Sequence, residues 1–257
     1  MSPHPEQQHR LLHVALVFSS LLGRISPLLL TPVWLASAAI GAWPWSGLRL
    51  SVAALGAFVI LIDGICLSLL PKCGRSYGPA TPPLLALAVV RTLLSLLIGR
   101  MSAMPRTLMI LAALQLLISV VVIYSTWIEP FWVGVTHNSL RNPKLREQGT
   151  VRLLHVSDLH VERITKRERE LVRRVQELKA DMLVLTGDYL NLSYNEDEQA
   201  QSDARNLLDQ MCSSVTGPTF AVTGSPLVDL ASVVPGIFDG LPITWLMDES
   251  QRIHVKG

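Results

Sequence analysis

The sequence predicts two unlike parts, an α-helical transmembrane region followed by an α/β unit. In the first half, apolar stretches recur at about the 20-residue length that spans a bilayer. Asp63 is the only carboxylate between residues 11 and 128. Farther along the chain, short apolar runs of strand length alternate with charged segments of helical period. We therefore expect a membrane region at 1–128, a linker at 129–150 and an α/β domain at 151–257.

Composition agrees with a chain that is half membrane protein. Of the 257 residues, 49% are hydrophobic and only 16% are charged, which is apolar for a protein that is soluble throughout. The net charge of +2 and the lack of a basic block interleaved with aromatic residues argue against nucleic acid as a partner. Cys66, Cys73 and Cys212 form no Cys-x-x-Cys pair, so we interpret them as free thiols.

Length divides the apolar half into candidate membrane spans. Residues 50–70 and 107–128 reach the length of a full span, whereas 84–98 is shorter and contains an arginine. The stretch 11–45 is interrupted by an arginine and two prolines. We expect about four spans in a multi-pass protein, with a fifth if residues 11–22 insert separately.

The distribution of Lys and Arg predicts the orientation in the membrane, because cytoplasmic loops carry an excess of both. Four spans would place the N-terminal flank and the α/β domain on the more basic side, which is expected to be the cytoplasm. A fifth span would remove this bias and put the domain opposite the N-terminus. The two basic sets are Arg10, Arg24, Lys72, Arg75, Arg141, Lys144 and Arg146 against Arg49, Arg100 and Arg106.

Two charged residues fall inside the expected spans. Asp63 lies seven residues before the end of its span, and Arg91 lies seven residues after the start of the next. In antiparallel helices of equal rise the two side chains reach the same depth, so we expect them to pair. A structural ion pair that orients two helices is one interpretation, and a proton or ion pathway is the other.

Three short apolar runs after the linker are expected to be strands, at residues 151–156, 182–186 and 220–223. Segments of helical period lie between them, at 164–178 and about 203–212. Strands that alternate with helices require crossover connections and therefore a largely parallel sheet.

Polar side chains follow each expected strand. Asp158 and His160 come after the first, Asp188 after the second and Ser225 after the third. Ligands of such sheets bind beyond the carboxyl ends of the strands. Carboxylates and an imidazole together suit manganese, iron or zinc, so the sequence predicts a divalent metal site at this edge.

The stretches Ser157-Asp158-Leu159-His160 and Thr186-Gly187-Asp188, each directly after a strand, resemble the first two motifs of the calcineurin-like metallophosphoesterases, membrane-anchored type. The resemblance implies that the domain is a calcineurin-like phosphoesterase sandwich and a hydrolase of phosphoesters. It also implies that Asp158 and His160 hold a first metal ion, which Asp188 bridges to a second.

The third family motif, Gly-Asn-His followed by Asp or Glu, is degenerate in this chain. Ser225 and Pro226 stand where the family has Asn and His, and the later Gly-His-x-His pair has no counterpart before residue 257. Serine is a poor substitute ligand, and proline has no side-chain donor. The resemblance thus implies one metal site, an incomplete second site and an incomplete domain.

A few other polar residues are candidate contacts for the metal or a phosphate. Asp229 is a substitute for the lost acidic residue or, alternatively, a carboxylate at a helix N-terminus. Asn191 either orients ligands or caps a loop. His254 is a substitute ligand or a structural histidine in a terminal strand.

Two functional hypotheses from different classes follow. The first is a membrane-anchored, metal-dependent phosphoesterase that acts on a phosphoester near the bilayer, such as a nucleotide or a lipid-linked phosphate. The second is a non-catalytic or truncated relative that binds one metal ion or a phosphorylated ligand. In both hypotheses the expected partners are the lipid bilayer and a phosphoester substrate or ligand.

Overall fold

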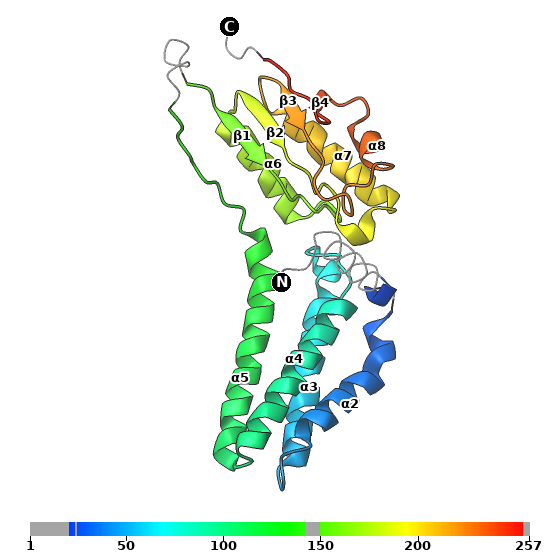
Figure 1. Cartoon of the computed structure of the whole chain (residues 1–257), viewed down its shortest axis with the longest axis vertical. Coiled ribbons are helices and arrows are strands. Elements are labelled where there is room, and N and C mark those ends of the chain that lie inside the picture. The colour runs from blue at the N-terminus through cyan, green and yellow to red at the C-terminus, as the bar shows by residue number, and fades with distance from the viewer. Residues whose placement is uncertain (1–20, 24, 142–149, 254–257) are drawn as a thin grey trace, which may run out of the picture. The chain divides into compact units, whose positions relative to one another are not determined.

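The computed structural model describes residues 21–23, 25–141 and 150–253 of the chain. The chain divides into two compact units, Met1–Pro130 and Phe131–Gly257, each of which is described by itself here. The first unit is helical, and the second contains all the strands (Figure 1).

Three helices of the first unit are long and apolar enough to cross a membrane. They are α3 (Arg49–Leu69), α4 (Thr81–Met101) and α5 (Pro105–Ile123), and a π-helical turn, η3 (Tyr124–Ile128), and a short 3-10 turn, η4 (Glu129–Phe131), extend the last of them. The sequence-based span at 84–98 is too short. The helix already begins at Thr81, because prolines are tolerated in a first turn, where the backbone N–H groups have no intrahelical partner.

Among the described residues 25–48, one shorter α-helix is present rather than a clear span. The 3-10 turn η1 (Pro27–Leu30) leads into α2 (Thr31–Ala42), which has 12 residues. A full span needs roughly 20 residues. The described part of the chain therefore holds three helices of spanning length where about four spans were predicted, and most of the suggested fifth span lies outside the described residues.

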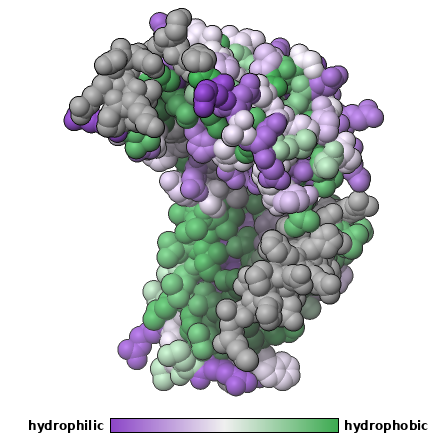
Figure 2. Space-filling view, turned by 45° about the horizontal axis from the view of Figure 1, so that its top comes forward, coloured by the Kyte–Doolittle hydropathy of each residue, from purple (hydrophilic) through white to green (hydrophobic). Residues whose placement is uncertain are grey.

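The surface of the helical unit is strongly hydrophobic (Figure 2). Leu61, Leu97 and Met109 are each at least 60% exposed, which is costly in water but favourable against lipid chains. At the ends of the helices, Arg49 lies over the ring of Trp43, and Arg75 lies over the ring of Trp127. Aromatic rings with basic partners are typical of the membrane–water interface.

Small residues let these helices approach closely. A Cβ atom at Gly99 would lie 2.4 Å from Nε1 of Trp45, and that nitrogen donates a hydrogen bond to the Ser95 carbonyl at 2.9 Å. A Cβ atom at Gly41 would lie 3.1 Å from the Ser95 Cβ. Close packing of small side chains is a main source of helix association in lipid.

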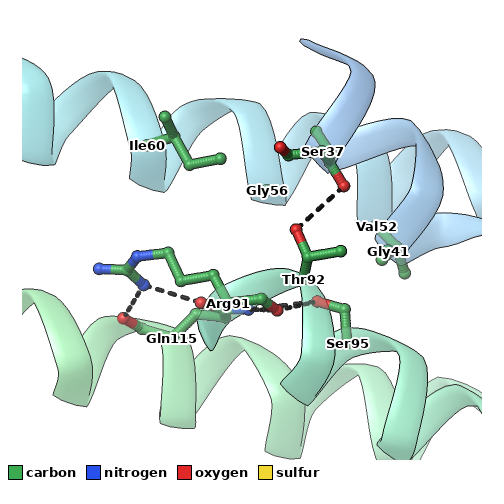
Figure 3. A pocket seen from close by; sticks show the side chains of 10 residues that line it. Ser37, Gly41, Val52, Gly56, Ile60, Arg91, Thr92, Ser95 and Gln115 are labelled. Atoms are coloured by element: carbon green, nitrogen blue, oxygen red, sulfur yellow. Dashed lines mark hydrogen bonds between the residues drawn. The ribbon is translucent and has the colours of Figure 1, made fainter. Parts of the chain in front are cut away.

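The predicted intramembrane pair is present. Arg91 donates to Asp63 Oδ2 through Nε at 2.8 Å and through Nη2 at 2.7 Å, and both side chains are 1–2% exposed. The same guanidinium donates to Ser119 Oγ and to two oxygens of Gln115, and Ser119 Oγ donates to Asp63 Oδ1. We call these four residues the intramembrane network. Figure 3 shows Arg91 and Gln115 beside a small cavity that is also lined by Ser95.

The second unit contains a four-stranded sheet in which every strand pairs in parallel with its neighbour along the chain. The strands are β1 (Leu153–Val156), β2 (Met182–Leu185), β3 (Thr219–Ala221) and β4 (Ile243–Trp245). The crossover helices are α6 (Lys166–Leu178), α7 (Glu198–Ser213) and α8 (Val234–Phe238). The parallel sheet agrees with the sequence-based prediction.

The helices of this unit cover one face of the sheet (Figure 1). Alternate strand residues, such as Leu154, Leu183 and Ala221, share a hydrophobic core with side chains of all three helices. This follows from the strand order, because right-handed crossovers that always step in the same direction leave every helix on the same side. On the opposite face His155 and Leu153 are exposed.

The last part of the unit was not foreseen from the sequence. β4 has three residues and α8 has five, and neither is long enough to produce a clear period. In the described residues the strands form one sheet, so the two-layered sandwich that the resemblance implies stays a prediction.

Candidate metal centre

Three potential metal ligands meet where β1 and β2 end. Nε2 of His160 lies 3.7 Å from Asp188 Oδ2 and 4.0 Å from Asp158 Oδ1, and one ligand atom from each residue lies within 4.8 Å of the other two. We call these residues the rim triad. It is the only cluster of three or more His, Cys, Asp or Glu with this geometry among the described residues.

The spacing within the rim triad suits a shared cation better than hydrogen bonding. In the described structure the side chains of the rim triad donate no hydrogen bond to one another, since 3.7 Å exceeds hydrogen-bond length. Two atoms bound to one ion at about 2.0–2.2 Å lie no more than about 4.4 Å apart, and the distances of 3.7 Å and 4.0 Å from His160 Nε2 to the two carboxylates are within this limit. Two carboxylates that face each other repel unless a positive charge lies between them, so the donor set fits a divalent ion such as manganese, iron or zinc.

Every member of the rim triad has a left-handed backbone. The φ angles are 55° at Asp158, 42° at His160 and 56° at Asp188. Non-glycine residues rarely adopt this conformation, which costs of order 1–3 kcal/mol each and is concentrated at functional sites. The fold therefore holds these side chains in place against a local conformational preference.

Hydrogen bonds between the two loops maintain this geometry. The amide of Asp158 donates to the Gly187 carbonyl at 3.1 Å, and that of His160 donates to the Asp188 carbonyl at 2.9 Å. Val161 and Leu190 continue the pairing as an isolated parallel bridge. Each loop is thus an extension of the strand pair, and the spacing between the ligands is set by the sheet.

The loop after β3 packs directly against Asp188. A Cβ atom at Gly187, where φ is 93°, would lie 2.0 Å from the Gly224 backbone nitrogen, so only glycine fits there. The next amide, that of Ser225, donates to Asp188 Oδ1 at 2.9 Å. Ser225 thus contacts Asp188 through its backbone, and no contact of its hydroxyl with the triad is observed. A hydroxyl ligand was one of the predicted roles.

Asp229 has a structural role that neither of its two interpretations described. The residue is 5% exposed, and its carboxylate accepts hydrogen bonds from three backbone amides, those of Asp188, Tyr189 and Gly224, at 2.7–3.0 Å. Both of its oxygens accept these bonds, so Asp229 connects the loops after β2 and β3 to each other. Burial, and next the Asp229 charge, raise the pKa of the Tyr189 hydroxyl, which donates to the Val222 carbonyl.

Asn191 has the capping role, which was one of its two predicted interpretations. The side-chain oxygen of Asn191 accepts from the Ser193 amide at 3.1 Å, while its nitrogen donates to Glu162 at 2.9 Å; Asn191 therefore caps the short 3-10 turn η6 (Leu192–Tyr194). His155 is hydrogen-bonded to Thr186 Oγ1 on the exposed face of the sheet. His254 lies outside the described residues.

No family model, curated protein or solved structure matches this chain in the comparisons. The assignment of function therefore depends on the motifs and on the geometry of the rim triad.

Proposed function

We propose that this chain is a membrane-anchored protein of the calcineurin-like metallophosphoesterase type whose α/β unit binds one divalent metal ion. The observation that carries the proposal is the rim triad: Asp158, His160 and Asp188 converge at the carboxyl edge of a parallel sheet with ligand atoms within 4.8 Å. The order of the motifs, Asp-x-His after one strand and Gly-Asp after the next, supports the family type.

The substrate class in this proposal is a phosphoester. A divalent ion at the triad supplies Lewis-acid polarisation of a phosphoryl oxygen. Three residues would hold that ion: Asp158 and His160 from the loop after β1, and Asp188 from the loop after β2. Asp188 is in turn oriented by the Ser225 amide, and such supporting contacts set ligand geometry.

The chain offers little beyond one metal site for rapid hydrolysis. Pro226 occupies the place of the family's motif histidine and has no group that donates a proton. General acid catalysis contributes typically about 10²–10⁴-fold. The oxygens of Asp229, the nearest substitute carboxylate, already accept backbone hydrogen bonds. We therefore propose metal-dependent phosphoester binding with slight turnover.

A titration of the full chain in detergent with Mn²⁺, followed by calorimetry, tests the metal site. One ion per chain is expected, and Asp188→Asn should weaken binding by roughly 100-fold or more, since loss of even a supporting residue costs 10–100-fold. Asp209→Asn, an exposed carboxylate on α7, is the matched control. Equal affinity of the two variants would refute the site.

A hydrolysis assay separates the two functional hypotheses. With bis(p-nitrophenyl) phosphate and saturating Mn²⁺, the full chain should show only slight turnover. Fast turnover that disappears in Asp158→Ala would show that the chain is a competent phosphoesterase and that residues other than Pro226 complete its site.

We further propose that the protein is multi-pass, with the α/β unit on the cytoplasmic side. Each of the three long helices would cross the membrane, so the loops that follow them lie on alternate sides, whether or not α2 also crosses. Five basic residues then flank the helix ends on the side of the α/β unit and three on the other; they are Lys72, Arg75, Arg141, Lys144 and Arg146 against Arg49, Arg100 and Arg106.

A native cysteine allows a test of this orientation. Cys73 is exposed between α3 and α4, on the side assigned to the α/β unit, whereas Cys212 is buried. In a Cys66→Ser background, a membrane-impermeant maleimide should label inverted vesicles and not intact cells. Labelling of intact cells would reverse the assignment.

A further inference from the structure

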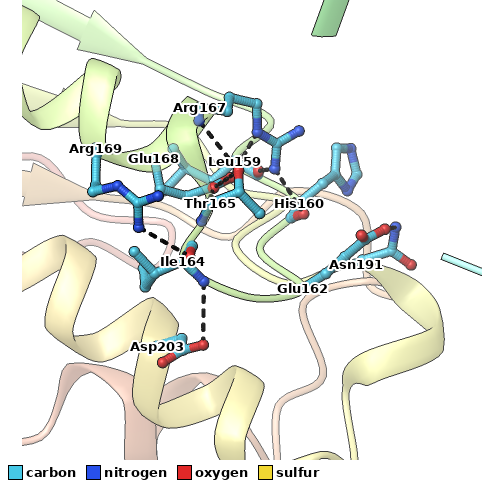
Figure 4. Close-up of polar contacts among 10 residues, drawn as sticks. All are labelled: Leu159, His160, Glu162, Ile164, Thr165, Arg167, Glu168, Arg169, Asn191 and Asp203. Atoms are coloured by element: carbon cyan, nitrogen blue, oxygen red, sulfur yellow. Dashed lines mark hydrogen bonds and ion pairs between the residues drawn. The ribbon is translucent and has the colours of Figure 1, made fainter. Parts of the chain in front are cut away.

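The loop that carries Asp158 and His160 is also held by helix α6. Arg167, in the first turn of α6, donates through Nη2 to the carbonyls of Leu159 at 3.1 Å and His160 at 3.3 Å (Figure 4). These carbonyls belong to the segment whose amides bond to the β2 loop. The loop is therefore fixed through its amides by the loop after β2 and through two of its carbonyls by α6.

The guanidinium of Arg167 is itself anchored. Its Nε donates to Glu168 Oε1 at 2.6 Å, and Glu168 is 2% exposed. The second oxygen of Glu168 accepts from the amide of Thr165 at 2.7 Å and from its hydroxyl at 2.5 Å, which forms a capping box at the start of α6. A buried carboxylate thus sets the direction in which Arg167 points.

We infer that Arg167 is a positioning residue for the metal site, an inference that depends on the proposed metal-binding function. It bridges the fixed start of α6 and the strained loop, and so restricts the orientation of His160 relative to Asp188. A planar guanidinium suits this role, because its rigid fork of donors reaches several acceptors at once, whereas a lysine ammonium is a single point.

The same helix offers a matched control. Arg169 has the same side chain two residues later, and it donates one hydrogen bond, at 3.3 Å, to the carbonyl of Ile164 (Figure 4). No contact of Arg169 with the loop carbonyls of Leu159 or His160 is observed. Removing Arg169 takes away the same charge from α6 but leaves the support of the metal loop intact.

The test is Mn²⁺ affinity of the full chain in detergent for Arg167→Ala, Arg167→Lys and Arg169→Ala. Arg167→Ala should weaken binding by roughly 10-fold or more, the range seen for residues that support metal ligands. Arg167→Lys should recover only part of this loss, and Arg169→Ala should match the wild type. The electron paramagnetic resonance spectrum of bound Mn²⁺ should broaden in the Arg167 variants alone, which a change in overall stability would not produce.

Hydrogen exchange in peptides from β2 and α7 verifies that each variant is folded. If Arg167→Ala fails this check, Arg167→Lys carries the test. Equal affinities for the Arg167 and Arg169 variants would overturn the inference and leave the metal site standing. Absence of Mn²⁺ binding by the wild type would overturn the metal site and the inference with it.

Discussion

The two clusters of charged side chains in this protein are built in opposite ways. In the intramembrane network Arg91 and Asp63 bond to each other and to Ser119, and both are almost completely buried. In the rim triad His160 Nε2 lies 3.7 Å from the nearer of the two carboxylates, and the Asp158 side chain is 67% exposed. The charged groups of the first cluster are hydrogen-bonded within the cluster, whereas the ligand atoms of the second are not hydrogen-bonded to one another.

This difference follows from the surroundings of each cluster. Lipid supplies no hydrogen bonds, so a polar group among helices that cross a membrane, as we propose for α3, α4 and α5, must find its partners within the protein. At the edge of the sheet, water can hydrogen-bond to an exposed carboxylate. Two carboxylates and an imidazole can therefore lie around a gap without bonding to one another. Left-handed backbone at all three triad residues shows that this arrangement is imposed by the fold.

The hydrogen bonds of Asp63 and Arg91 favour one of the two interpretations of this pair. The described hydrogen bonds engage both oxygens of Asp63 and all three nitrogens of Arg91. A proton or ion pathway needs a group that exchanges its partners, whereas this closed network favours a structural role that fixes α3, α4 and α5 in register.

The largest effect is expected from breaking the closed network. Asp63→Leu or Arg91→Leu alone leaves one buried charge without its partner and should lower the free energy of unfolding by about 3–5 kcal/mol. The double variant should lose much less than the sum. Unfolding in mixed micelles, followed by fluorescence, measures this coupling, with Arg100→Leu at the exposed end of α4 as control. Additive losses would show that the two charges act independently.

A smaller effect is expected from filling the open triad. Mn²⁺ at 100 times its dissociation constant should stabilise the α/β unit by about 2.7 kcal/mol. Hydrogen exchange in peptides from β1 and β2 should slow, while that in α3 and α4 should not change. Asp188→Asn should remove the effect. Stabilisation that persists in Asp188→Asn would place the ion elsewhere.

Asp229 provides an intermediate case, because it is a buried carboxylate of the α/β unit that is satisfied by backbone amides. Asp229→Asn replaces one acceptor oxygen by a donor that faces other donors, and should cost about 1–3 kcal/mol. Thermal unfolding of the α/β unit measures the loss, and Asp239→Asn, an exposed aspartate after α8, is the control. A neutral result would mean that the loops after β2 and β3 do not depend on Asp229.

The smallest effect is expected from a charge cluster on the surface. Hydrogen bonding by Arg173, and to a lesser degree by Arg174, lowers the pKa of Glu170 from 4.5 to about 2. Because the pKa is lower in the folded protein, Glu170 contributes stability above pH 4.5 that is lost as the pH falls toward 2. Glu170→Gln should flatten the stability profile slightly in this window at low salt and leave it unchanged at high salt. An equal difference at both salt concentrations would contradict the electrostatic origin.

The sequence was sufficient for features that depend on local pattern. Apolar length predicted α3 and α5, and the alternation of strands and helices predicted a parallel sheet. The pairing of Asp63 with Arg91 followed from their equal depths, because helix rise is constant. The convergence of Asp158, His160 and Asp188 followed from their positions after neighbouring parallel strands, whose carboxyl ends meet at one edge.

Only the tertiary structure decided what each polar side chain contacts. Asp229 and Ser225 follow the same strand, yet the carboxylate turns inward to three amides while the serine offers its backbone N–H to Asp188. The Thr165-x-x-Glu168 spacing is typical of a capping box, but no local sequence pattern predicts that Arg167 contacts the carbonyls of the metal loop. Periodicity and strand order predict where a residue lies along an element. Its hydrogen-bond partners depend on which loops the fold brings into contact, because these bonds form only within about 3 Å.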